Sequence, residues 1–315
     1  MSAVAVILEP GLLTTVQDLG RPGLRHLGVP RSGAADRLSF SCANAALGNS
    51  IGAAALEATL TGPTLRFHSD HSFCLGGANM NASLNDKAIA PYQPTDARKG
   101  DVLQLSAARV GARCYIAFRG GLDGEDFLGS LSTYPPAALG GIAGRALKKG
   151  DELCGANLSS HACRTLPQSL HATLTHDFIL RANVGPNAEM IDPASLEKFF
   201  ASAFTVDRRV GRMGARLTGA DIALADAHPM NSSAVFPGTV QCPPDGAPFL
   251  LLADAQTLGG YPRIAQLIAA DLPLTGQIRP GDRVWFRKVS AEAARYITLQ
   301  KQALIRASLP EFSFY

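Results

Sequence analysis

Short apolar runs separated by turns rich in glycine and proline recur along the whole chain. Runs of about four to eight such residues, bounded by turn residues, are typical of β-strands. Several runs are apolar throughout, which predicts strands that are buried on both faces. The strands expected on this basis are Ala3–Leu8, Thr64–His68, Val102–Leu105, Cys114–Arg119, Phe178–Arg181, Gly238–Cys242, Pro248–Ala253 and Arg283–Val289.

Helices are expected to be few. Asp192 and Ser290 are suited to be N-caps of two of them, and Gly48 lies where the first would end. The segments with helical spacing are Ala35–Leu47, Pro193–Ala203, Arg263–Asp271 and Ala291–Ala307.

One turn pattern occurs three times: a basic residue, one further residue, then Gly-Asp, followed by an apolar stretch. It is found at Arg98–Asp101, Lys148–Asp151 and Arg279–Asp282. We expect the glycine to adopt a positive φ and the aspartate to bind backbone N–H groups just beyond the turn. Because the pattern occurs in both halves, it favours two related β-barrel-like units, and the polar stretch Ala156–Gln168 is the best candidate for the linker between them.

Composition narrows the class of protein. The 315 residues suit two domains, and 46% hydrophobic with 17% charged residues predicts a folded chain with a large core. The net charge of +3 without a basic block argues against nucleic-acid binding. No apolar run is long enough to span a membrane, the N-terminus lacks a basic signal-peptide region, and the six cysteines form no C-x-x-C pair. A cytoplasmic protein with reduced thiols is expected.

The common catalytic motifs are absent, including the phosphate loop, the dinucleotide fingerprint, H-E-x-x-H and G-x-S-x-G. The two histidine pairs, His68 with His71 and His171 with His176, do not lie in segments suited to hold a metal. We therefore expect no metal site. The chain also lacks a Met-Lys-Met segment, so it is not expected to carry biotin itself.

Polar clusters in glycine-rich turns remain as candidate chemistry. The first contains Gln17, Asp18, Arg21, Ser32 and Asp36, which could face one pocket, with an anion held at the start of the helix near residue 34. The alternative for this cluster is a polar turn network that caps the helix. Both interpretations stay open.

Two further clusters have weaker signals. In Arg119–Thr133, Asp123 and Asp126 are expected to bond to turn backbone rather than to catalyse. In Val210–Leu217, Arg212 and Arg216 are either a binding site for a carboxylate or phosphate, or a surface arginine pair.

The fourth cluster, Leu252–Arg263, has the strongest signal. A buried strand ends here, and the polar residues are followed by a predicted helix N-terminus. Donors and acceptors beside glycines at a strand's end suit an anionic or amide ligand. Its residues of interest are Asp254, Gln256, Thr257, Gly259, Gly260, Tyr261 and Arg263, with Gln241 on the preceding strand.

These clusters occur in the order found in a known family. The matching segments are TTVQDLGRPG, SGAAD, LEATLTGPTLRF, CYIAFRGGLD, LGSLST, GGIAGRALKKGDEL, RMGARL and FPGTVQCPPDGAPFLLLADAQTLGGYPRIAQLIAADL. Through them, from about Gly11 to Val289, the chain resembles the family of the C subunit of bacterial 5-oxoprolinase, also described as the KipA or allophanate-hydrolase-subunit-2 family.

The resemblance implies two cyclophilin-like β-barrel units, over residues 1–155 and 176–290, with a linker over 156–175 and a helix and tail over 291–315. It also implies opening of the lactam 5-oxo-L-proline to L-glutamate, driven by ATP, in a complex with a KipI-like B subunit and together with an A subunit. Where ATP binds stays open, and the B subunit is one possible holder.

For an ATP-coupled lactam hydrolase of this kind, we expect the following roles for the clusters. Asp254 is expected to be the acid or base, or to bind the ring N–H, while Gln256, Thr257 and Gln241 orient the amide and Tyr261 joins the catalytic set. Arg212 or Arg263 would hold a carboxylate or phosphoryl group, and Gly259 and Gly260 form the turn. Gln17, Asp18 and Arg21 would complete the cleft.

Two rival functions remain. One is the carboxyltransferase half of a biotin-dependent urea or amide carboxylase, and the other is a non-catalytic KipA-type regulator that binds a KipI-type partner. The chain also departs from the family's pattern at three places. The departures are Val210-Gly211 instead of Ser-Asn, Leu131 instead of Arg, and Leu258 instead of Thr.

Overall fold

The computed structural model describes residues 3–156, 161–225 and 230–314. The chain divides into two compact units, and it passes between them more than once. Unit 1 contains Met1–Arg21, Ser32–Leu174 and Ile305–Phe312, and unit 2 contains Pro22–Arg31, Thr175–Leu304 and Ser313–Tyr315. Of the predicted linker 156–175, residues 157–160 lie outside the described residues, and residues up to Leu174 belong to unit 1.

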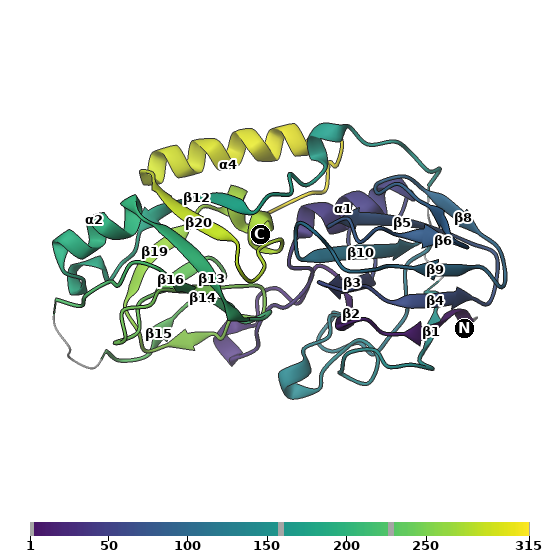
Figure 1. The fold of residues 1–315 in the computed structure, drawn as a ribbon, viewed down its shortest axis with the longest axis horizontal. Coiled ribbons are helices and arrows are strands. Elements are labelled where there is room, and N and C mark those ends of the chain that lie inside the picture. Colours follow the sequence, from purple (N-terminus) through teal and green to yellow (C-terminus); the bar gives the residue numbers. More distant parts are fainter. Residues whose placement is uncertain (1–2, 157–160, 226–229, 315) are drawn as a thin grey trace. The chain divides into compact units, whose positions relative to one another are not determined.

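Unit 1 is built from two antiparallel sheets (Figure 1). The first has the strand order β11-β1-β4-β9-β6-β7 and the second β2-β3-β10-β5-β8. Their strands are β1 (Ala3–Glu9), β2 (Leu13–Gln17), β3 (Ala55–Thr59), β4 (Thr64–Phe67), β5 (His71–Gly77), β6 (Ser83–Leu84), β7 (Lys87–Ala88), β8 (Thr95–Ala97), β9 (Val102–Gln104), β10 (Arg113–Phe118) and β11 (Glu152–Cys154).

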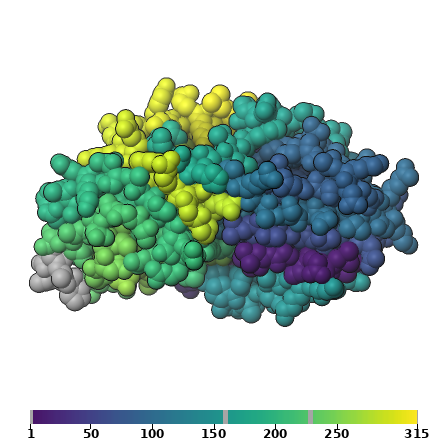
Figure 2. Space-filling view, viewed as in Figure 1, coloured from purple at the N-terminus to yellow at the C-terminus, as the bar shows by residue number. Residues whose placement is uncertain are grey.

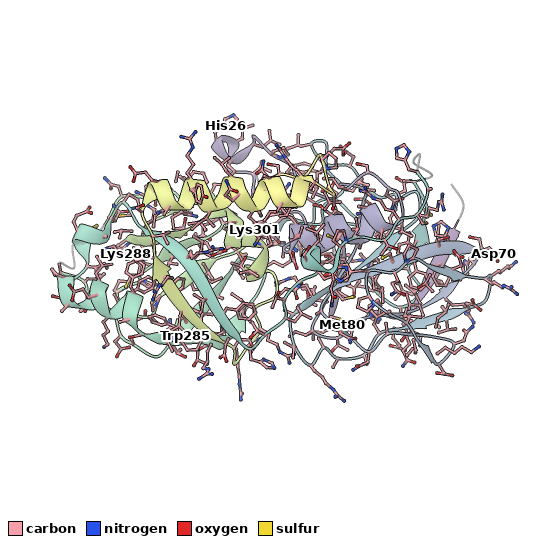
Figure 3. The ribbon with its side chains drawn as sticks, turned by 90° about the horizontal axis from the view of Figure 1, so that it is seen from above. His26, Asp70, Met80, Trp285, Lys288 and Lys301 are labelled. Carbon is pink, nitrogen blue, oxygen red and sulfur yellow. The ribbon has the colours of Figure 1, made fainter. Side chains whose placement is uncertain are left out.

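Strand β10 explains why some apolar runs have no polar positions. Its Ile116 and Phe118 join a core shared by both sheets, which also contains Met80 (Figure 3). Tyr115 and Ala117 point the other way and pack with helix α1 (Arg37–Ala46). Because β10 is covered on both faces, all six of its residues are buried, which the sequence predicts for the apolar run that begins at Cys114.

Unit 2 is a closed barrel with the strand order β12-β19-β16-β17-β14-β13-β20, closed by the parallel pair of β12 and β20. A separate ribbon pairs β15 with β18 (Figure 1). The strands are β12 (Asp177–Val184), β13 (Ala203–Val210), β14 (Gly214–Thr218), β15 (Ser233–Ala234), β16 (Thr239–Gln241), β17 (Phe249–Leu251), β18 (Leu258–Gly259), β19 (Arg263–Leu267) and β20 (Arg283–Lys288).

The barrel strands show the alternation expected of a sheet with one buried face. In β12, Phe178, Leu180 and Ala182 are buried in the barrel core, whereas Ile179 between them is 66% exposed. Trp285, opposite Ile179 on β20, lies on the outer face as well (Figure 3). The predicted mainly β fold with few helices is confirmed.

Three of the four predicted helices are present. Asp192 caps α2 (Pro193–Ala201) by accepting from the N–H of Ser195, as predicted. Helix α4 (Ala291–Arg306) is the longest in the described part of the chain and lies at the surface in Figure 2. A short α3 covers Leu272–Thr275, and single 3-10 turns cover Arg25–Leu27, Pro135–Ala137, Gln168–Leu170, Ala188–Met190 and Ala269–Asp271. No helix among the described residues is long and apolar enough to cross a membrane.

The predicted helix Arg263–Asp271 is wrong. Its first part is strand β19, which pairs with β12 and β16, and only Ala269–Asp271 form a 3-10 turn. The apolar positions of this segment fit either period, and the pairing partners decide between them. The polar side chain of Gln266 is partly buried in this strand, and its amide is satisfied there. It accepts from the hydroxyl of Thr239 and donates to the carbonyl of Pro237.

The three Gly-Asp turns have the predicted positive φ, at 93°, 89° and 87° for Gly100, Gly150 and Gly281. The aspartate, however, bonds backward rather than to residues beyond the turn. Each carboxylate accepts the N–H of the basic residue three positions earlier, at 2.7–3.0 Å. This geometry closes the turn on itself and directs the next residues into a strand.

Candidate functional site

Asp18, at the end of β2, holds the segment 127–133 in unit 1. One of its carboxylate oxygens accepts from the N–H of Gly20 and the hydroxyl of Ser130, both at 2.7 Å, and from the hydroxyl of Ser132. The other accepts from the N–H of Leu131 at 2.8 Å. Four donors therefore meet one carboxylate, which binds two distant parts of the chain together.

Arg21 and Gln17 bind the same segment. The guanidinium of Arg21 is 1% exposed and donates to the carbonyls of Phe127 and Ser132, with the ring of Phe127 beneath it. The side-chain N–H of Gln17 donates to the carbonyl of Thr133. Gln17, Asp18 and Arg21 thus form a polar turn network in unit 1, which was the alternative interpretation of the first cluster.

Asp36 also has a local role. Its carboxylate accepts from the backbone N–H and the hydroxyl of Ser39 and caps α1. Asp123 and Asp126 bond to the N–H groups of Gly124 and Gly129, so their predicted turn role is confirmed.

A cavity of about 460 Å³ adjoins Asp18 in unit 1. Its lining includes Asp123, Asp126, Leu122 and Leu131, and the part of the lining that the structure describes contains no lysine or arginine. A site lined by carboxylates without a basic partner repels an anionic ligand. This cavity therefore does not fit the carboxylate of a lactam acid.

In unit 2 the third and fourth clusters come together. The guanidinium of Arg212 binds both carboxylate oxygens of Asp254, each at 2.8 Å, and the two side chains are 5% and 2% exposed. The backbone repeats the link, because the N–H of Asp254 donates to the carbonyl of Arg212 at 2.8 Å. A bidentate pair of this kind fixes the loop after β17 in one geometry.

Beyond Asp254, the side-chain amides of Gln241 and Gln256 meet. Gln241 is 1% exposed, accepts from the amide of Gln256 at 3.3 Å and donates to the carbonyl of Tyr261 at 3.1 Å. A Cβ on Gly259 would lie 2.6 Å from this amide, so only glycine leaves room for it. Gln256 and Thr257 are partly exposed, and Tyr261 is 47% exposed, so these three can reach a ligand.

The two remaining arginines of these clusters are used differently. Arg263 donates to the side chain of Asn187 and the carbonyl of Ala234. It is the first residue of strand β19, whereas the sequence predicted a helix N-terminus with an anion site here. Arg216 pairs with Asp245 at the surface and, through that hydrogen bond, lowers the pKa of the Asp245 carboxyl.

No group of three metal-ligating side chains occurs among residues 3–156, 161–225 and 230–314. Cys242, next to Gln241, is fully buried, and burial raises the pKa of its thiol to about 11. A thiol with such a pKa is a poor nucleophile near neutral pH. The chemistry of this site therefore lies in amide, hydroxyl and carboxylate groups.

Sequence reasoning missed Arg25. It lies on the 3-10 turn Arg25–Leu27, in the short segment that belongs to unit 2, and its guanidinium binds the loop that carries Gln256. Burial lowers its pKa. The sequence around Arg25 indicates little, since it shows only a second arginine after Arg21 with no acidic residue next to it.

The positions that depart from the family's pattern are dispersed. Leu131 lines the cavity of unit 1. Leu258 lies on β18, next in sequence to Thr257 and Gly259, and is 60% exposed. Val210 ends β13, and the N–H of Gly211 bonds to the carbonyl of Gly214. Of the three, Leu258 is nearest in sequence to the residues that can reach a ligand.

Comparison with known proteins gives consistent matches. A family model described as carboxyltransferase domain, subdomain A and B, matches residues 27–288. Proteins named as the C subunit of 5-oxoprolinase from Haemophilus influenzae and Escherichia coli are each 37% identical, and each alignment covers 91% of this chain and 92% of the relative. The crystal structure of the K. lactis urea amidolyase superposes with a TM-score of 0.93 at 31% identity, over 97% of this chain but 20% of that protein.

Proposed function

The chain belongs to the carboxyltransferase domain family, subdomain A and B, and from this we propose that it is the C subunit of an ATP-dependent 5-oxoprolinase. Two relatives named as that subunit match it over nearly their whole length, whereas the urea amidolyase is about five times longer than the matched part. On this proposal it acts in the cytoplasm with the A and B subunits of the enzyme.

The observation that supports a lactam substrate is the exposed amide and hydroxyl set of Gln256, Thr257 and Tyr261 beside the buried pair Arg212–Asp254. A lactam presents one N–H and one C=O, and an amide side chain can bind both. We propose that Gln256 and Thr257 orient the lactam and that Tyr261 contacts it.

Asp254 takes a different role from the acid or base predicted from sequence. Both of its oxygens bind Arg212 and its side chain is 2% exposed, so we propose that it positions the loop rather than transferring a proton. Holding a reacting group in a productive geometry can itself supply much of the rate enhancement.

ATP does not fit the residues of this turn. Backbone N–H groups at a helix N-terminus commonly bind phosphate groups, but the residues from Arg263 onward form a strand instead. Arg263 is also engaged with Asn187 and Ala234. We propose that the nucleotide binds to the partner subunits.

The deciding test is reconstitution of this chain with the A and B subunits. We expect ADP release that depends on 5-oxo-L-proline. A stable complex without such release would exclude the 5-oxoprolinase function and leave the carboxyltransferase half and the non-catalytic regulator as candidates.

The structural match to urea amidolyase favours one alternative, the carboxyltransferase half of a biotin-dependent urea or amide carboxylase. That function requires a separate biotinylated protein. Streptavidin capture of such a protein with the native complex would support it, and its absence from an intact complex would count against it.

Replacing Gly259 by alanine is expected to lower turnover by at least about tenfold, because the new Cβ displaces the amide of Gln241, which holds Gln256. The free energy of unfolding should fall by only about 1 kcal/mol, the net contribution of a typical hydrogen bond. The matched control is Gly260→Ala, since the nearest atoms to a Cβ there are 3.7 Å away. Equal turnover of the two variants would show that the Gln241 amide does not order the site.

A further inference from the structure

Arg25 joins two segments that are far from it in sequence. One of its terminal guanidinium nitrogens donates to the carbonyl of Val235 at 2.6 Å and to the carbonyl of Gln256 at 2.7 Å. The other approaches the carbonyl of Ala255 at 3.4 Å. The guanidinium thus connects the chain just after β15 with the chain just before β18.

The connection extends the β15–β18 ribbon. In the ribbon, Ser233 and Ala234 pair with Gly259 and Leu258, and the N–H of Val235 then donates to the carbonyl of Thr257 at 3.1 Å. The carbonyl of Val235 points instead to Arg25. Arg25 therefore supplies the donors where the strands separate and the loop toward Asp254 begins.

The burial of these groups makes the contact important. Val235 and Ala255 are fully buried, so carbonyl oxygens at this place need a donor from the protein. Phe236 covers the guanidinium, with its ring centroid 5.5 Å from the central carbon of the guanidinium. A planar guanidinium can serve several carbonyl oxygens at once, whereas the ammonium of lysine is a point charge without the same fork.

We infer that Arg25 is a positioning residue, which holds the backbone of Ala255 and Gln256 so that the Gln256 and Thr257 side chains face the lactam. This role rests on the proposed function. Arg25 touches only backbone carbonyls and the Phe236 ring among the contacts described, so its effect on the reaction passes through the loop.

The test compares Arg25→Ala and Arg25→Lys with the control His26→Ala. His26 lies on the same 3-10 turn and is exposed, with its side chain directed outward (Figure 3). In the reconstituted complex of A, B and C subunits we expect Arg25→Ala to lower kcat by about 100-fold, the loss typical of a displacement of about 1 Å. Added guanidinium ion should restore part of this kcat, and Arg25→Lys should be intermediate.

A second measurement does not depend on turnover. Hydrogen exchange of the Val235 N–H should be faster in Arg25→Ala than in the wild type and unchanged in His26→Ala. Unchanged exchange, or faster exchange with wild-type kcat, would overturn the inference. Absence of turnover in the wild type would refute the proposed function instead, and the exchange rates would then decide whether Arg25 orders the loop. If Arg25→Ala does not fold, the same comparison is made with Arg25→Lys.

Discussion

Replacing Asp254 by alanine is expected to lower the free energy of unfolding by about 3–5 kcal/mol, the cost of breaking a buried ion pair from one side. The change removes the carboxylate that binds two N–H groups of the guanidinium of Arg212, which is buried with it. Turnover of the reconstituted enzyme should fall to background because the loop loses its anchor. Urea denaturation and 5-oxoproline-dependent ADP release measure the two effects.

The control for this prediction is Asp245→Ala, which breaks the pair with Arg216. Those two side chains are 50% and 26% exposed, and a surface pair contributes about 0–1 kcal/mol. Similar losses in the two variants would mean that burial does not strengthen the Arg212–Asp254 pair. A double variant that also replaces Arg212 by methionine should recover part of the stability, since it removes the buried charge.

The second large effect is expected at Asp18. Asp18→Ala leaves the N–H of Leu131 and the hydroxyls of Ser130 and Ser132 without their shared acceptor. We expect a loss of about 2–4 kcal/mol, because each buried donor left unsatisfied costs about 1–3 kcal/mol and hydroxyls can partly reorient. Urea denaturation measures the loss, and hydrogen exchange at Leu131 should show that the segment 127–133 opens.

Asp123→Ala is the matched control for Asp18, because the Asp123 carboxylate accepts from the N–H of Gly124 in its own turn. Its cost should stay near the net contribution of one hydrogen bond, about 1 kcal/mol. If Asp18→Ala were as stable as this control, the segment 127–133 would be held mainly by Arg21 and Gln17.

Much of the fold was predictable because strand burial leaves a direct trace in the sequence. Phe178, Leu180 and Ala182 mark the barrel side of β12, and the uninterrupted apolar run of β10 reports its two covered faces. The trace fails at Ile264 and Leu267. Their spacing of three residues is typical of a helix, although both belong to strand β19, and only pairing with β12 and β16 decides.

The candidate site was predictable in composition but not in connections. The density of donors and acceptors in Leu252–Arg263 indicated a site, and the structure gathers Gln241, Gln256 and Gly259 there. The partner of Asp254 is 42 residues away, and Arg25 is 231 residues from Gln256. No local sequence pattern shows which arginine binds which acceptor, because the tertiary fold brings these distant residues together.

The return of Pro22–Arg31 to unit 2 has a consequence for modularity. A gene cut at residue 174 would yield a barrel fragment without Arg25, with the carbonyls of Val235 and Gln256 deprived of its donors. The other fragment would lack Ile305–Phe312, which belongs to unit 1. Segments of the two units therefore alternate along the chain, so a single crossover cannot exchange one complete unit without part of the other.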